Sequence, residues 1–297
     1  MDKDQLSPKL GRLIDAAKAA ALRAADRPAE AEAPAESVTR QAEGVALLLA
    51  DGTVCSAPGS NDEVHAQPAA AAGAAARRTG EVESVAAAVA VANDPAQTLN
   101  PSPRTRRVLT EVDPNLPLVV KQQGRWVMAP LSDLPPLAAE LRVERVRHPG
   151  HDLLDILEVY DLEAFGRTGL RTYDLAVMAE AGAVFLACLG DEIVGGCQLL
   201  RVLDEPTFFY VVGFYIRPAW QGLRLGRAFL DAVAAGARRL DAGGLVLTVS
   251  PDNQRAINLY ESAGFVNERF VPQFYGEGQD RHILRWWFGP GGLQGSV

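Results

Sequence analysis

The stretch from residue 207 to residue 249 constrains the fold more than any other part of the chain. Residues 207–216, TFFYVVGFYI, form an apolar run that predicts a buried strand, and a predicted helix at 222–240 separates it from a second apolar run at 244–249. A connection of this length joins parallel neighbours in a sheet. The strands expected before it, 183–189 and 192–203, follow one another through tight connections and are therefore expected to pair antiparallel. The sequence thus predicts a mixed sheet that changes from antiparallel to parallel pairing at 207–216 and splays open there.

The other elements predicted after about residue 142 complete an α/β domain. They are a strand at 142–147, helices at 150–165, 172–181 and 253–263, and strands at 265–275 and 281–288. Pro135 and Pro136 interrupt regular structure in the segment 130–142, PLSDLPPLAAELR, so we expect a domain boundary there. The predicted domains are residues 1–137 and residues 142–297.

The start of the predicted helix 222–240 has the features of an anion site. The segment WQGLRLGRAFL, residues 220–230, places Gly222 and Gly226 around the helix start. The first N–H groups of a helix lack partners and the helix dipole is positive there, which favours a bound phosphate. Small residues also let the backbone approach the anion closely. The pattern therefore favours a phosphate cradle over its alternative, an ordinary glycine-containing start of an amphipathic helix.

Two sequence blocks in this order resemble the GNAT acyltransferase superfamily. YIRPAWQGLRLGRAFL, residues 215–230, is similar to [RQ]-x-x-G-x-[GA] after a strand ending in V/I-x-P, and residues 250–270, SPDNQRAINLYESAGFVNERF, are similar to N-x-x-A-x-x-L-Y-x-x-x-G-F. Arg224 stands where the family has its first glycine, but the backbone amide remains and a guanidinium suits a phosphate. The resemblance implies a mixed α/β domain with a splayed central sheet and acetyl-CoA as the acyl donor. The residues expected to bind acetyl-CoA are Tyr215, Ile216, Gln221, Gly222, Leu223, Arg224, Leu225, Gly226, Arg227 and Asn253.

The same resemblance suggests catalytic residues. It implies that the Tyr260 hydroxyl lies near the thioester sulfur, and we expect it to act as general acid toward the leaving thiolate; the alternative is a core-packing role on its helix face. An attacking amine must also lose a proton. The two positions where GNAT enzymes often carry a glutamate hold Tyr210 and Thr248, so no general base is assigned, and Tyr210 is expected to order a water. Tyr275 is expected either to line the acceptor pocket or to be an aromatic residue at a hairpin edge.

The first half of the chain predicts a separate layered α/β domain. Its expected elements are helices at 6–25, 64–78 and 103–112, a hairpin at 45–57 that turns at Asp51-Gly52, and strands at 84–91, 117–121 and 125–129. That order, together with the segment NPSPRTRRVL at 100–109, resembles the cytidine deaminase family. The resemblance implies an α/β/α arrangement of layers.

The chemistry of that family is missing from the corresponding motifs. Cytidine deaminases hold zinc through a [CH]-A-E motif and a P-C-x-x-C motif, and the glutamate transfers protons. Here the first motif reads His65-Ala66-Gln67, and Ser102 and Thr105 occupy the cysteine positions. These side chains do not make a normal Zn²⁺ site, and Gln67 cannot exchange a proton. We therefore expect a deaminase-like domain with no metal and no activity; the alternative is an unrelated α/β domain with His65 at a helix surface or cap.

Composition limits the partners and the cellular compartment that we expect for this chain. The net charge is −8 and the isoelectric point is about 5.1, so nucleic acid is not an expected partner. No apolar run approaches the roughly 18 residues of a membrane helix, and the N-terminal segment resembles an amphipathic helix more than a signal peptide. The three cysteines, Cys55, Cys188 and Cys197, have no metal-ligand spacing. We expect a reduced, cytoplasmic protein without a membrane partner.

These observations predict an acetyl-CoA-dependent N-acetyltransferase for a small-molecule or peptide-like amine. The first domain would supply a wall of the acceptor site, a dimer surface in a homo-oligomer, or substrate selection. Two alternatives remain open: a non-catalytic sensor of acyl-CoA or a nucleoside, and an acetyltransferase for a nucleoside-like amine.

Overall fold

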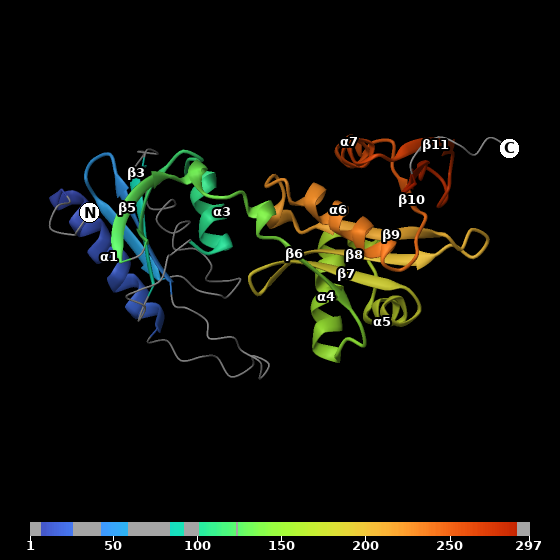
Figure 1. Cartoon of the computed structure of the whole chain (residues 1–297), viewed down its shortest axis with the longest axis horizontal. Coiled ribbons are helices and arrows are strands. Elements are labelled where there is room, and N and C mark those ends of the chain that lie inside the picture. Colours follow the sequence, from blue (N-terminus) through green and yellow to red (C-terminus); the bar gives the residue numbers. More distant parts are fainter. Residues whose placement is uncertain (1–6, 26–42, 59–83, 92–100, 123, 290–297) are drawn as a thin grey trace. The chain divides into compact units, whose positions relative to one another are not determined.

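The computed structural model describes residues 7–25, 43–58, 84–91, 101–122 and 124–289 of the 297-residue chain. The chain divides into two compact units, Met1–Pro135 and Pro136–Val297. We describe each unit by itself (Figure 1).

The described residues of the first unit form a five-stranded sheet with a helix on each face. Its elements are α1 (Pro8–Ala25), β1 (Glu43–Leu49), β2 (Val54–Pro58), β3 (Ser84–Val91), α3 (Pro103–Val112), β4 (Pro117–Gln122) and β5 (Arg125–Pro130). The strand order is β2-β1-β3-β4-β5, in which only β3 and β4 pair in parallel. The predicted helix 64–78, with His65 and Gln67, lies outside the described residues.

Alternation along β1 explains why both faces of this sheet carry a helix. Val45 and Leu47 belong to the core under α3, whereas Ala46 and Leu48 belong to the core under α1. Figure 1 shows the two helices on opposite sides of the sheet. At Gly44 a Cβ atom would lie 2.2 Å from a backbone oxygen of α1, so a glycine is needed for this close packing.

The second unit is a seven-stranded sheet covered on both faces. Its elements are β6 (Arg142–Val146), α4 (His151–Phe165), α5 (Thr172–Ala181), β7 (Ala183–Leu189), β8 (Glu192–Arg201), β9 (Phe208–Ile216), α6 (Leu225–Arg238), β10 (Gly244–Val249), α7 (Gln254–Ala263), β11 (Val266–Val271) and β12 (Arg281–Trp287). The strand order is β11-β12-β10-β9-β8-β7-β6. Helices α6 and α7 contribute to one apolar core, and α4 and α5 contribute to the other. A short 3-10 turn, Pro218–Trp220, joins β9 to the loop before α6.

The splayed sheet expected from the sequence is confirmed. Strands β6 to β9 pair antiparallel, and β9 pairs in parallel with β10 only along 208–210 and 244–246. Beyond Tyr210 the two strands separate, and a register shift opposite Gln198 and Leu199 leaves Val212 as an extra residue in β9. A bulge of this kind bends its strand, which helps to open the sheet at this point.

Helix α6 begins three residues later than the sequence predicted. Gly222 has φ +86° and Arg224 has φ +60°, and neither value is compatible with a right-handed helix. The residues between β9 and α6 therefore form a loop that ends at Leu225. Within the described part of the chain, no helix combines the length and apolar character needed to cross a membrane.

Candidate functional site

The loop between β9 and α6 leaves the N-terminal end of α6 free to bind an anion. None of the described side chains caps α6, whose N-cap residue is Arg224 in the left-handed conformation. A Cβ atom at Gly226 would meet only Leu259 Cδ2 at 3.5 Å and Ile216 Cγ1 at 3.9 Å, and a Cβ at Gly222 would meet nothing within 4 Å. Protein packing therefore does not require a glycine at either position. The φ of +86° favours a glycine at residue 222, and space for a ligand at unpaired helix N–H groups explains Gly226.

The loop is anchored on both sides of this opening. The Trp220 side chain is fully buried, and its indole N–H donates to Glu192 Oε1 at 3.1 Å. The Gln221 amide donates to the Ile216 carbonyl at 2.9 Å and accepts from Arg255 Nη1 at 2.9 Å. The predicted residue Gln221 therefore ties the end of β9 to α7. Such anchoring holds the backbone N–H groups in place before any ligand arrives.

Several residues predicted to bind the cofactor direct their side chains elsewhere. Leu225 is buried in the core and Leu223 packs against it. The Arg227 guanidinium binds Asp231 and donates to the Ser262 carbonyl at 2.8 Å. For Leu223 and Leu225, only the main chain remains available to an anion at the helix end.

Helix α7 brings Tyr260 and Asn253 to the same side of the sheet as α6. Tyr260 is buried, with its ring 6.2 Å from Phe214 and 5.4 Å from Phe265. Burial raises the pKa of the Tyr260 phenol, so the hydroxyl stays protonated at neutral pH. The Asn253 side-chain oxygen caps α7 by accepting from Ala256 N–H at 3.1 Å. The geometry thus gives Tyr260 both a packing role and a proton that it can donate.

Three hydroxyl groups meet across the splayed strands. The Tyr210 hydroxyl lies 3.0 Å from Thr248 Oγ1 and 3.0 Å from the Tyr275 hydroxyl, and Thr248 and Tyr275 are 3.2 Å apart. The Arg281 guanidinium lies 5.0 Å from the centre of the Tyr275 ring. Burial is the main cause that raises the pKa of Tyr210 to about 12. The structure therefore places the two residues found at the usual glutamate positions, together with Tyr275, in one hydroxyl cluster.

A buried polar cluster lies between α4 and the central strands. Asp161 Oδ1 accepts from Leu170 N–H at 2.7 Å, and Oδ2 accepts from the Gln198 amide at 3.0 Å. A Cβ atom at Gly213 would lie 2.4 Å from Gln198 Oε1, so this glycine makes room for the amide. The Tyr215 hydroxyl is buried and has no hydrogen-bond partner among the described residues. Because the Tyr215 side chain is buried at this cluster, only its main chain remains a candidate for cofactor contact.

Two carboxylates of the second unit form ion pairs with arginines. Glu205 binds Arg285 with N–O distances of 2.5 and 3.1 Å. Glu158 accepts hydrogen bonds from Thr172 and Arg171, and these bonds lower the pKa of Glu158 to about 2. Neither carboxylate is arranged as a free general base.

In the first unit, Ser102 and Thr105 lie together at the start of α3. The Ser102 hydroxyl oxygen accepts from Thr105 N–H at 3.3 Å and lies 3.1 Å from Thr105 Oγ1. The serine therefore serves as an N-cap, a role that needs no metal. Among the described residues, no cluster of three or more His, Cys, Asp or Glu side chains is arranged to hold a metal ion.

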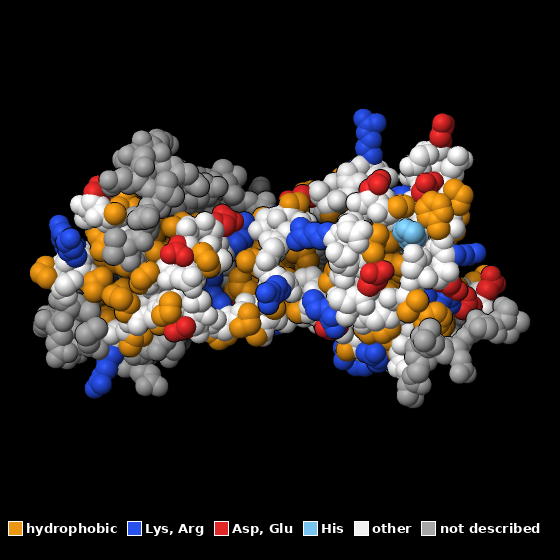
Figure 2. Space-filling view, turned by 90° about the horizontal axis from the view of Figure 1, so that it is seen from above, with side chains coloured by type: hydrophobic (Ala, Val, Ile, Leu, Met, Phe, Trp, Pro, Cys, Tyr) orange, Lys and Arg blue, Asp and Glu red, His pale blue; other side chains and the backbone are white. Residues whose placement is uncertain are grey.

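The sequence motifs did not identify every residue at this site. Arg255 and Arg281 contact predicted site residues, but no spacing rule distinguishes them from surface arginines. Asp161 and Gln198 lie on elements far apart in the chain, so their pairing depends on the tertiary structure. On the face seen in Figure 2, acidic, basic and apolar side chains are interspersed over the second unit.

Comparison with known proteins agrees with the fold of the second unit. The sequence model of the Acetyltransferase (GNAT) family matches residues 150–265. A mycothiol acetyltransferase of Geodermatophilus obscurus is 48% identical over 105 residues, covering 32% of this chain and 32% of the relative. A mycothiol acetyltransferase of Streptomyces scabiei is 32% identical over 165 residues, covering 54% of this chain and 48% of the relative.

A solved structure adds a comparison of the fold. The ribosomal-protein-S18-alanine N-acetyltransferase from Escherichia coli is 18% identical and has a TM-score of 0.44, covering 53% of this chain and 99% of its own. The chain spans a third to a half of the length of the two mycothiol acetyltransferases. The sequence model of the Acetyltransferase (GNAT) family thus matches the part of this chain that contains the splayed strands β9 and β10 and the open end of α6.

Proposed function

We propose that the second unit transfers an acetyl group from acetyl-CoA to the amine of a small molecule or a peptide-like substrate. The observation that carries this proposal is the open N-terminal end of α6, where protein atoms do not fill the space beside Gly222 and Gly226. The pyrophosphate of coenzyme A suits unpaired helix N–H groups and the positive end of the helix dipole. The relatives named mycothiol acetyltransferase favour a small-molecule acceptor.

The site residues fit this donor in distinct ways. The backbone from Gly222 to Arg227 would hold the pyrophosphate, and the exposed Arg224 and Arg255 side chains lie beside it to add positive charge. The amide nitrogen of Asn253 is left for the pantetheine arm because its oxygen caps α7. Bound acetyl-CoA would supply an activated acyl group, and Tyr260 would donate a proton to the sulfur that leaves.

The hydroxyl cluster would orient the acceptor without serving as a strong base. Because the pKa of Tyr210 is raised to about 12, the phenol is neutral through the physiological range. Tyr210, Thr248 and Tyr275 would therefore hydrogen-bond the amine or a water beside it. The main contribution to rate would come from holding amine and thioester together, which is worth roughly 7–11 kcal/mol in favourable systems.

Calorimetry tests the donor site. We expect acetyl-CoA to bind the wild-type chain, and Gly226→Trp to abolish binding because the indole fills the space at the helix end. Gly11→Trp is the matched control, since a Cβ at Gly11, on α1 of the first unit, also meets nothing within 4 Å. Absence of binding at millimolar acetyl-CoA would exclude this donor. Equal binding by folded Gly226→Trp would show that acetyl-CoA binds elsewhere on the chain.

Turnover separates this enzyme from the second candidate, a non-catalytic sensor of acyl-CoA or a nucleoside. That candidate is favoured by one observation: the two usual glutamate positions carry hydroxyl residues. Incubation with labelled acetyl-CoA and a panel of amines, including nucleoside-like amines, tests both. Steady transfer of label supports the enzyme and identifies its acceptor class, whereas saturable binding without transfer to any amine supports the sensor.

For the first unit we propose a deaminase-like domain without zinc or deaminase activity. The helix–sheet–helix layers and the placement of Ser102 and Thr105 at the start of α3 support this proposal. This domain would contribute a wall of the acceptor site, a dimer surface or substrate selection. Elemental analysis that finds about one zinc per chain, together with cytidine deamination, would contradict it. The free state of Cys55, Cys188 and Cys197 supports a reducing compartment such as the cytoplasm.

A further inference from the structure

A hollow lined by arginines lies at the opposite end of α6 from the cradle. It has a volume of about 380 Å³ and is lined by Arg145, Ala181, Gly182, Arg201, Phe209, Arg239, Leu240 and Asp241. Helix α6 has 14 residues, so at 1.5 Å per residue its two ends are roughly 20 Å apart. This hollow is therefore separate from the proposed acetyl-CoA site.

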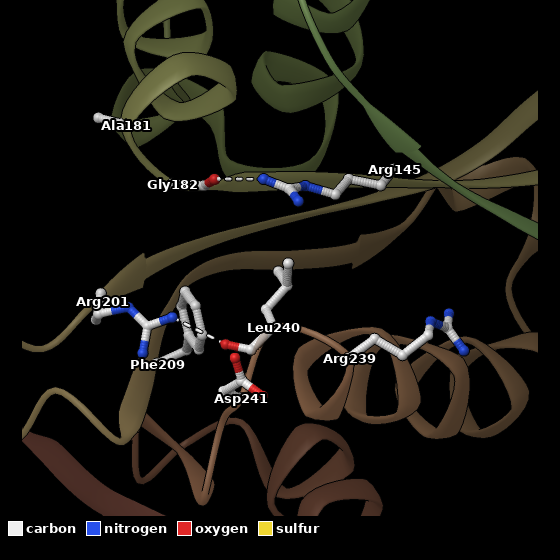
Figure 3. A pocket seen from close by; sticks show the side chains of 8 residues that line it. All are labelled: Arg145, Ala181, Gly182, Arg201, Phe209, Arg239, Leu240 and Asp241. Carbon is white, nitrogen blue, oxygen red and sulfur yellow. Dashed lines mark hydrogen bonds between the residues drawn. The ribbon is translucent and has the colours of Figure 1, made fainter.

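The arginines that line this hollow come from different elements. Figure 3 shows Arg145 of β6 and Arg201 of β8 on opposite sides, while Arg239 follows the last turn of α6 and extends away from Arg201. A second hollow of about 230 Å³ shares Arg145, Arg239 and Leu240 with the first and adds Arg147. Four arginines thus line a depression made of these two adjoining hollows, with Asp241 as the carboxylate in the lining of the first.

The protein leaves much of the hydrogen-bonding capacity of these arginines unused. Arg145 Nη2 donates to the Gly182 carbonyl at 3.3 Å, and Arg201 donates to the carbonyls of Leu240, at 2.9 Å, and Pro206. A guanidinium has five N–H groups, so most of them remain available. The Nε of Arg145 is buried and has no hydrogen-bond partner among the described residues.

Acidic side chains do not neutralise the cluster. Within the described part of the chain, none of the four arginines forms an ion pair with an aspartate or glutamate, in contrast to Arg217, Arg227 and Arg285 of the same unit. Helix-end carbonyls explain why Arg145 and Arg201 lie here. They do not explain Arg147 and Arg239, whose side chains form no hydrogen bond or ion pair with a described residue.

We propose that this depression, the arginine hollow, binds a small phosphate-bearing molecule. Planar guanidinium groups form paired, charge-assisted hydrogen bonds with phosphate oxygens. The volume of about 380 Å³ falls in the range of small-molecule sites, and Phe209 and Leu240 supply an apolar wall for an organic group. The Arg201 guanidinium lies over the Phe209 ring at 4.5 Å.

Calorimetry with the full chain tests the arginine hollow, using inorganic pyrophosphate and adenosine monophosphate as probes and adenosine as the uncharged control. The variant to use is Arg147→Gln combined with Arg239→Gln, because both side chains are exposed and form no hydrogen bond or ion pair with a described residue. Each lost arginine is expected to weaken binding about tenfold, which corresponds to about 1.4 kcal/mol. Arg269→Gln, an exposed arginine on β11, is the matched control and should leave binding unchanged.

Gly226→Trp separates the arginine hollow from the cradle. Pyrophosphate or adenosine monophosphate binding that persists in Gly226→Trp and weakens in the double variant supports the proposal, and the tighter of the two probes distinguishes inorganic from organic phosphate. Three results would overturn it: binding lost in Gly226→Trp and kept in the double variant, equal weakening in Arg269→Gln, or adenosine binding as tightly as its monophosphate.

Discussion

Arg224 has a backbone conformation that favours glycine, at the position where the sequence departs from the family pattern. Its φ of +60° and ψ of 15° are left-handed, and a side chain in this region costs roughly 1–2 kcal/mol. We therefore expect Arg224→Gly to raise the free energy of unfolding by at most about 1 kcal/mol. The greater conformational entropy of the unfolded chain with a glycine offsets part of this gain. Urea unfolding measures this difference. Gly222→Ala, at φ +86°, should change stability in the opposite direction, and a less stable Arg224→Gly variant would contradict the argument.

Tyr260 combines a buried ring with a protonated hydroxyl, and one substitution separates the two roles. Tyr260→Phe keeps the contacts with Phe214 and Phe265 and removes only the hydroxyl. General acid catalysis contributes about 10²–10⁴-fold, so we expect kcat to fall by that factor while acetyl-CoA affinity and thermal stability stay nearly unchanged. The measurement is kcat with an identified acceptor.

Tyr260→Ala provides the comparison for the packing role, because it should lose stability through the cavity that it leaves. A Phe variant whose kcat stays within about threefold of wild type would rule out the general-acid role, provided that chemistry limits the rate.

At the scale of elements, Asp161 links α4 to the central strand β8 through Gln198. Burial is the main cause that raises the pKa of Asp161 above its ordinary value of 3.8. As the pH rises above 3.8, the unfolded chain loses this proton before the folded chain does, so the carboxyl group makes the protein less stable toward neutral pH. We expect Asp161→Asn to remove this dependence on pH. The asparagine oxygen can accept from Leu170 N–H, and its NH₂ group can donate to Gln198 Oε1 once the Gln198 amide has rotated.

Urea unfolding at several pH values from about 4 to about 7 compares wild type with Asp161→Asn. The stability of the variant relative to wild type should increase with pH. Asp161→Ala should instead cost about 1–3 kcal/mol, because it leaves buried polar groups unpaired. A difference between Asp161→Asn and wild type that is independent of pH would show that the carboxyl group does not titrate as described.

The elements themselves could be predicted well because their patterns are local. Apolar runs set the bounds of β3, β7 and β10, and the crossover at 207–249 predicted the parallel pair and the splay. The late start of α6 could not be predicted, since a positive φ at Arg224 is unusual for a side-chain-bearing residue. The hydroxyl cluster was only partly predictable. The sequence identified Tyr210, Thr248 and Tyr275 separately, and pairing across the sheet determines that their hydroxyls meet.

At the scale of the whole molecule, the apolar cores follow the division into two units. The two cores around the sheet of the second unit draw their residues from Leu137 onward, and the cores of the first unit end at Leu134. The cradle, Tyr260, the hydroxyl cluster and the arginine hollow all belong to the second unit. The second unit therefore contains every group to which the proposed reaction assigns a role, and the roles proposed for the first unit concern the acceptor and assembly.

A truncation tests this division of roles. We expect residues 136–297 to unfold cooperatively when produced alone and to bind acetyl-CoA within about threefold of the full chain, because both cores and the cradle are retained. Acceptor KM measured in the same pair of proteins then reports the contribution of the first unit. A rise in KM with unchanged donor affinity would assign substrate selection to the first unit, because loss of a wall weakens acceptor binding alone. A truncated protein that folds but no longer binds acetyl-CoA would show that the first unit supports the cradle, contrary to the separation of the cores.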